Sequence, residues 1–142
     1  VTGINFIDSN VFIHAILKPR RELQNHETEI KHAAQQILQK VEDGEPVVTT
    51  PAHISEVAII LESRVSHPTS ATILQTIVSL NALTVHTLTG DHVKAAATLS
   101  QRMRLGFNDT LAYLIMKETG TEEIYSFDTD FDQIPGMTRR TR

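Results

Sequence analysis

The feature that most constrains the fold is an alternation of short apolar runs with longer segments whose apolar residues follow helical spacing. The apolar runs predict strands at residues 4–7, 46–49, 83–88 and 124–127. The longer segments predict helices at residues 10–17, 26–42, 50–65, 68–80, 90–103 and 108–119. Strands that alternate with helices indicate an α/β fold, with a parallel sheet covered by helices on both faces.

Local signals set the expected helix ends. Thr50 followed by Pro51 is typical of a helix start, because the hydroxyl caps the first turn and proline suits the first helical position. Gly90 begins another helix, and Asn108 is a candidate cap for the last one. Gly120 then ends that helix.

Length and composition limit the class of protein. A chain of 142 residues with 40% hydrophobic residues suits one globular domain, which we expect to span residues 1–142. The absence of cysteine excludes disulfides and thiolate metal sites. We find no signal peptide and no apolar run near the ~20 residues of a membrane span, so we expect a soluble cytoplasmic protein without membrane contact.

The net charge of −4 gives no general attraction to nucleic acid, although local clusters of basic residues still permit binding. These clusters contain Lys18, Arg20 and Arg21, then Arg102 and Arg104, then Arg139, Arg140 and Arg142.

Acidic residues recur at strand ends and helix starts, and each one alone has an ordinary explanation. Asp8 follows the first strand and could cap the next helix. Glu56 could lie on an exposed helix stripe, and Asp109 could be an acid favoured by the helix dipole. Asp128 and Asp130 follow the fourth strand, where one aspartate would be enough for a turn.

Together the acids favour a site. The carboxyl ends of parallel strands meet at one edge of a sheet, where ligands bind in open α/β folds. Crowded carboxylates repel one another, and hard cations such as Mg²⁺ or Mn²⁺ relieve this repulsion through oxygen ligands. Such ions activate water in phosphodiester chemistry.

Other kinds of site have less support. The histidines never fall in a zinc-binding spacing and are interpreted as surface or packing residues, and no glycine-rich phosphate loop is present. Asp128-Thr129-Asp130 has the Asp-x-Asp form of a haloacid-dehalogenase-like phosphatase, but it lies near the end of the chain and only Lys117 precedes it closely. A phosphorelay receiver domain would need a lysine late in the sheet. A non-catalytic binding module would make the acids individually dispensable.

Four segments resemble those of the PIN-domain ribonucleases, a family that includes the VapC-type toxins of toxin–antitoxin pairs. They are "NFIDSNVFIHAI", "TTPAHISEVAIIL", "RLGFNDTLAYLIMKETG" and "IYSFDTDFDQIPGM", in the order that the family uses. The resemblance covers nearly the whole chain. It implies a three-layer α/β/α domain with a central parallel sheet in the order 3-2-1-4, and it allows a short fifth strand.

The resemblance also implies a site and partners. The acidic quartet would be Asp8, Glu56, Asp109 and Asp128, with Asp130 sharing or taking the fourth place. Ser126 and Asn10 would support it. The ion would be Mg²⁺ or Mn²⁺, and the substrate RNA. From the basic clusters we expect Arg20, Arg21, Arg102 and Arg104 to hold the RNA backbone. The protein would be a homodimer silenced by a small antitoxin, or a housekeeping RNA-processing nuclease of the same fold.

Overall fold

A computed structural model describes residues 3–142 of the chain. The elements of this part follow in the order β1 (Asn5–Ile7), α1 (Ser9–Ile16), α2 (Asn25–Glu42), β2 (Val47–Thr49), α3 (Pro51–Arg64), α4 (His67–Val78), β3 (Leu83–Val85), α5 (Gly90–Met103), α6 (Phe107–Thr119), β4 (Glu123–Tyr125), the short 3-10 helix η1 (Thr129–Gln133) and β5 (Thr138–Arg140).

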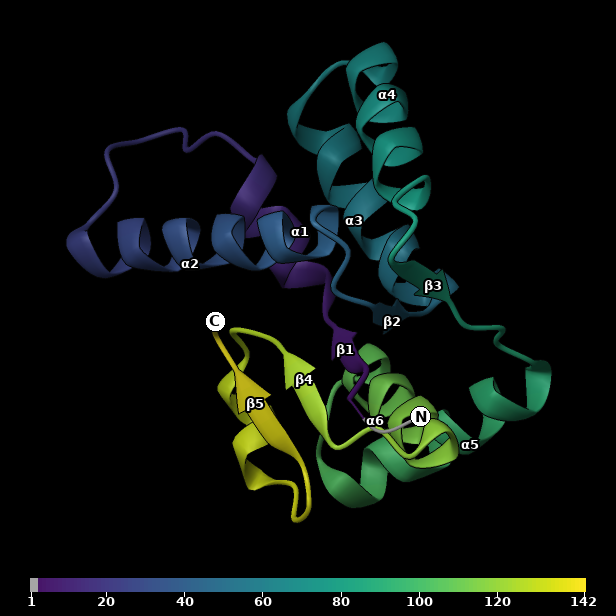
Figure 1. Cartoon of the computed structure of the whole chain (residues 1–142). Coiled ribbons are helices and arrows are strands. Elements are labelled where there is room, and N and C mark those ends of the chain that lie inside the picture. Colours follow the sequence, from purple (N-terminus) through teal and green to yellow (C-terminus); the bar gives the residue numbers. More distant parts are fainter. Residues whose placement is uncertain (1–2) are drawn as a thin grey trace.

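The strands form one sheet in the order β3-β2-β1-β4-β5, and every neighbouring pair is parallel. This confirms the predicted order 3-2-1-4 and the fifth strand, which pairs with β4 (Figure 1). Because all strands run the same way, the residues that follow β1 and β4 lie at the same edge.

Alternating side chains divide the core into two layers. Phe6 belongs to an apolar cluster that includes buried residues of α6, whereas its neighbour Ile7 belongs to a cluster with α1 to α4. Ile124 and Tyr125 on β4 alternate in the same way. Successive residues of a strand point to opposite faces, so helices cover the sheet on both sides, as Figure 1 shows. The predicted α/β/α class is confirmed.

Side chains fix most helix starts where the sequence predicts them. The Thr50 hydroxyl accepts a hydrogen bond from the backbone N–H of His53 at 3.3 Å, and Thr89 caps α5 in the same way through His92 at 3.2 Å. The predicted capping role of Asn108 is wrong. Gly106 is the N-cap of α6, and Asn108 lies one residue inside the helix. Gly120 ends α6 in the left-handed region, with φ of 72°.

The third strand is shorter than the run at 83–88 predicts. It pairs only with β2, which has three residues, so the ladder has no partner after Val85. The backbone N–H of His86 makes a last bond to the Thr49 carbonyl at 2.8 Å, and the chain then turns into α5.

No helix in the described part of the chain combines the length and hydropathy that a bilayer crossing requires.

Candidate metal site at the carboxyl edge of the sheet

The predicted acids come from four segments that meet at one edge. Asp8 follows β1, and Asp128 follows β4 as the N-cap of η1. Glu56 lies in the second turn of α3, and Asp109 lies in the first turn of α6. Strand ends and helix beginnings bring these acids to one edge, where Asp109 and Asp128 cluster with Asp130. Asp8 and Glu56 lie outside that cluster, although Asp8 is close enough to Glu56 and Asp128 to feel their charges.

Asp8 is both a helix cap and the innermost acid of the site. Its side chain is buried, with the residue 4% exposed, and Oδ1 accepts the backbone N–H of Ser9 at 2.9 Å. Asp8 therefore caps α1, as the capping interpretation predicts. A cap alone does not require a buried carboxylate, so Asp8 has a further role. An uncompensated carboxylate is expensive to bury, so its partners matter.

Ser126 and Asn10 form the polar support behind Asp8. The Ser126 hydroxyl donates to Asp8 Oδ2 at 2.7 Å and accepts the backbone N–H of Asp128 at 3.0 Å. Asn10 Nδ2 lies 3.4 Å from the Ser126 hydroxyl, and Asn10 Oδ1 accepts the backbone N–H of Phe127 at 3.2 Å. Both residues thus contact the segments that carry Asp8 and Asp128, and their supporting role in the site stays a prediction.

Glu56 is half-buried and held by two donors that the sequence did not single out. The Ser9 hydroxyl donates to Oε1 at 2.6 Å, and Asn108 Nδ2 donates to the same oxygen at 3.2 Å. A sequence signal could have identified both donors. Ser9 is a short polar residue directly before Asn10, and Asn108 is one directly before Asp109.

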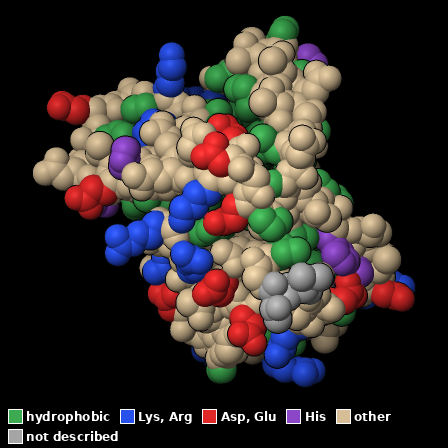
Figure 2. All heavy atoms as spheres, in the orientation of Figure 1, with side chains coloured by type: hydrophobic (Ala, Val, Ile, Leu, Met, Phe, Trp, Pro, Cys, Tyr) green, Lys and Arg blue, Asp and Glu red, His purple; other side chains and the backbone are tan. Residues whose placement is uncertain are grey.

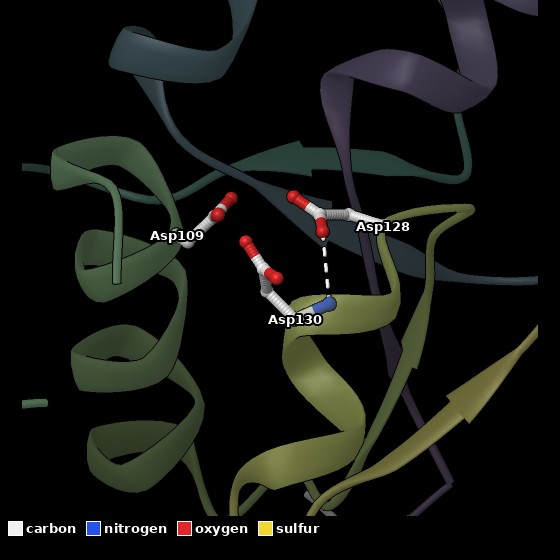
Figure 3. Close-up of side chains that lie close together, drawn as sticks. All are labelled: Asp109, Asp128 and Asp130. Carbon is white, nitrogen blue, oxygen red and sulfur yellow. Dashed lines mark hydrogen bonds between the residues drawn. The ribbon is translucent and has the colours of Figure 1, made fainter. Parts of the chain in front are cut away.

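Asp109, Asp128 and Asp130 form the tightest carboxylate group. One oxygen from each lies within 4.8 Å of the others, and Figure 3 shows the three side chains converging between α6 and η1. The backbone N–H of Asp130 donates to Asp128 Oδ1 at 2.9 Å, which fixes the turn between these two acids. Asp130 therefore lies in the cluster beside Asp128, and which of the two is the fourth acid stays a prediction.

Charge repulsion and burial raise two pKa values in the site. Burial is the main cause that raises the pKa of Asp109 to about 8, and the charges of Asp8, Asp128 and Asp130 add to it. Burial likewise raises the pKa of Asp8 to about 6, against hydrogen bonds from Ser126 and Ser9 that lower it. Asp8 and Asp109 thus resist ionisation in the absence of a cation.

The donor set suits a hard divalent cation. Every candidate ligand atom is a carboxylate oxygen, and Mg²⁺ and Mn²⁺ prefer such oxygens, whereas softer metals favour thiolate or imidazole. A cation would also offset the burial and the neighbouring negative charges that raise the pKa of Asp109. The residues therefore fit the ion that the sequence predicts.

One histidine lies against the site. His53 is 1% exposed, and its Nε2 is 3.9 Å from Asp8 Oδ1. Its ring packs edge-on against Phe6, with 5.0 Å between the ring centroids. The interpretation of the histidines as packing residues is correct for the contact between His53 and Phe6. It did not predict that Nε2 of His53 lies beside Asp8. The sequence signal is that His53 precedes Glu56 by three residues, about one helical turn.

The arginines predicted to bind RNA lie on exposed segments, away from the acid contacts. Arg21 forms a bidentate pair with Glu27, at 2.9 and 2.7 Å, and Arg20 contacts the Ser63 carbonyl at 3.5 Å. Arg102 lines a surface hollow between α5 and α6, and Arg104 is the left-handed C-cap of α5. The hydrogen bonds and ion pairs of the described residues give no direct contact between any of the four and the carboxylates, so their role in RNA binding stays a prediction.

Comparisons with known proteins agree with this architecture. No curated protein matches the chain at a significant level. Among solved structures, the chain is similar to VapC20 of Mycobacterium tuberculosis, described as a sarcin-ricin loop cleaving toxin. The TM-score is 0.70 and the identity 19%, over 89% of this chain and 92% of that one. At this identity the likeness shows the fold.

A family model identifies the chain more directly. The PIN domain model matches residues 6–137, which include all the acids of the site and end just before the strand β5. This span is far more than half of the chain. The chain therefore belongs to the PIN domain family.

Proposed function

We propose that the protein is a metal-dependent endoribonuclease that acts in the cytoplasm on RNA phosphodiester bonds. The observation that carries the proposal is the cluster of Asp109, Asp128 and Asp130 at one edge of a PIN-family sheet, with Asp8 and Glu56 beside it. Asp109, Asp128 and Asp130 would hold the ion, with Asp8 and Glu56 on the β1 and α3 side. When bound, Mg²⁺ or Mn²⁺ would activate water and stabilise the charge of the departing oxygen.

The chain itself supplies orientation and a candidate proton acceptor. Ser126 and Ser9 hold Asp8 from two sides. Both donors to Glu56 bind Oε1, and among the described residues no donor contacts Oε2. The second oxygen of Glu56 is thus available to accept a proton from a water that approaches the phosphodiester, which is the task of a general base.

Basic side chains near α5 are better placed to hold the RNA backbone than those near α2. Lys94, Thr98 and Arg102 lie on one face of α5 at four-residue spacing and line the same hollow, without an acidic neighbour in it. Arg21, by contrast, already forms an ion pair with Glu27. Phosphate contacts by unpaired cations supply most non-specific RNA affinity.

A second basic region mixes charges of both signs. Figure 2 shows Lys and Arg side chains gathered near the C-terminal strand, mixed with acidic ones. Lys40, Arg140 and Arg142 line a groove of about 610 Å³ together with Asp43. Arg140 also faces Glu123 at 3.5 Å. The mixed signs favour the α5 side for the first contact with RNA.

The finer proposal is a VapC-type toxin that forms a homodimer and is silenced by a small antitoxin. The fold shared with VapC20 supports it. The negative well of carboxylates would accept an Arg or Lys side chain of an inhibitor. On α3, Ile59 is 65% exposed, which offers an apolar contact for a second protein chain, whereas Ile54 packs against the core. The alternative is a housekeeping RNA-processing nuclease with the same site.

The purified protein should cleave labelled RNA with Mn²⁺ and stop when EDTA is added, because the acids need a cation to act together. Gel analysis of the products measures this, and fresh Mn²⁺ in excess over EDTA should restore cleavage. Cleavage that persists in chelator would contradict the metal mechanism. Hydrolysis of small phosphate esters without RNA cleavage would instead favour the phosphatase alternative. Without either activity, and without metal binding, a non-catalytic binding module would remain.

A further inference from the structure

A buried histidine contacts the site without a hydrogen-bond partner for one of its nitrogens. Among the described residues, His53 Nε2 is one of the few buried polar atoms that form no hydrogen bond. Asp8 Oδ1 lies 3.9 Å from it, and the ring is almost inaccessible to solvent. Buried polar atoms in folded proteins are nearly always paired, so an exception beside a catalytic acid calls for a function.

The other ring nitrogen determines which form the imidazole takes. His53 Nδ1 lies 2.6 Å from the Thr50 hydroxyl, and that oxygen also accepts the backbone N–H of His53 at 3.3 Å. If Nδ1 carried the proton, the buried hydroxyl would accept twice and its own hydrogen would have no acceptor. With the proton on Nε2, the Thr50 hydroxyl donates to Nδ1 and accepts the backbone N–H of His53, so the hydroxyl uses both its donor and its acceptor.

The tautomer with the proton on Nε2 is also the one that interacts favourably with Asp8. A lone pair on Nε2 would face a carboxylate oxygen, whereas an N–H there attracts it. Burial is the main cause that lowers the pKa of His53 to about 4, against the charge of Glu56 and a weak interaction with the Asn108 backbone, which raise it. Thr50 and Asp8 thus favour the same tautomer from opposite sides of the ring.

We propose that His53 is a positioning residue whose Nε2–H holds the Asp8 carboxylate from the α3 side. Asp8 is already held by Ser9 at the start of α1 and by Ser126 after β4. His53 adds the third element. The contact needs to shorten by about 1 Å to become a hydrogen bond, and the negative charge of ionised Asp8 favours that movement. The inference rests on the proposed function, because it takes Asp8 to be part of the metal site.

The tautomer can be measured without metal or RNA. Long-range ¹H–¹⁵N NMR spectra of the whole protein at neutral pH should show a neutral His53 ring with its proton on Nε2. A proton on Nδ1 would overturn the proposal whatever the fate of the nuclease assignment. Thr50→Val, which removes the partner of Nδ1, should weaken this preference, whereas Thr50→Ser should keep it.

Two substitutions separate positioning from packing. His53→Gln can place an amide N–H near the position of Nε2, whereas the shorter His53→Asn reaches only the position of Nδ1. We expect His53→Asn to weaken Mg²⁺ binding, measured by calorimetry, by about 10- to 100-fold, as for other partners of ligand residues. The kcat for RNA should fall more than KM changes, and His53→Gln should recover most of both losses.

His92 provides the matched control. It occupies the same third position of a helix capped by threonine, with its backbone N–H bonded to Thr89. His92→Asn and His92→Gln should leave Mg²⁺ affinity unchanged.

The outcomes distinguish the positioning role of His53 from the proposed metal-dependent function. Equal losses in His53→Asn and His53→Gln, or none in either, would overturn the positioning role while the metal site stands. If the wild-type protein binds no Mg²⁺, the proposed function fails and the positioning role fails with it. If His53→Asn does not fold, the wild-type tautomer and the Thr50 pair still decide the matter.

Discussion

Asp109→Asn should abolish RNA cleavage and at the same time stabilise the metal-free protein. Activity should fall by on the order of 10²-fold or more, since even residues that only support metal ligands cost about 10- to 100-fold. Stability should rise because asparagine removes a charge from a crowded group whose pKa is raised to about 8. Catalysis and stability would thus change in opposite directions, which a purely structural acid would not produce.

The stability gain should depend on pH in a defined window. The pKa of Asp109 is higher in the folded chain than its ordinary value of 3.8, so the folded state binds the proton more tightly than the unfolded state. This contribution is complete below pH 4 and is lost as the pH rises toward 8. Asp109→Asn should therefore match the wild type at low pH and melt higher near pH 8. The carboxyl is partly exposed, so we expect a gain of about 1 kcal/mol after screening, or roughly 4 °C.

Asp91 supplies a matched control for this substitution. It is an exposed acid in the first turn of α5, as Asp109 is in the first turn of α6. Asp91→Asn should leave cleavage unchanged and give no comparable gain in melting temperature, measured by calorimetry without metal. A large fall in the melting temperature of Asp109→Asn would contradict the account and make Asp109 a structural residue.

Expression of the protein alone should arrest bacterial growth, and Asp8→Asn should lift the arrest. The reason is that cleavage of an essential RNA is lethal, and Asp8 is the acid to which Ser9 and Ser126 are anchored. Colony counts after induction measure the effect, with immunoblots to show equal protein levels. Asn can keep the acceptor oxygen that caps α1, so the folded protein should persist.

Co-expression with an antitoxin tests the toxin role separately from the nuclease activity. Co-expression of a small antitoxin encoded next to this protein should restore growth and give a stable complex. If the wild type is harmless when expressed alone and binds no such neighbour, the toxin role is lost, and a housekeeping nuclease remains. A comparison of Asp128→Asn with Asp130→Asn would also show which acid contributes more to cleavage. We expect Asp128→Asn to lose more activity.

The sequence was sufficient for the fold because its signals are local and agree with one another. Apolar runs, helical spacing and caps such as Thr50 predict the elements, and parallel topology follows from their alternation. The extent of β3 was not predictable in this way, because it depends on how many residues β2 offers to the ladder. Strand length at an edge is a property of the pair and not of one run.

The site was predictable in its residue types but not in its contacts. The acids stand at strand ends and helix starts, which topology brings together. The hydroxyl of Ser9 and the amide of Asn108 bind Glu56 across about fifty residues of chain, and no local pattern encodes that. Asn108 was therefore assigned a capping role that Gly106 holds. His53 was hidden for the same reason, since burial against Phe6 and contact with Asp8 arise only on folding.

The central claim is that Asp109 and Asp128, with Asp130, hold a divalent cation. A crystal of the protein soaked in Mn²⁺, with diffraction recorded at the manganese absorption edge, tests it most directly. We predict an anomalous peak between these carboxylates, and its loss in a crystal of Asp109→Asn. Manganese bound only elsewhere, or a peak that survives the substitution unchanged, would contradict the account.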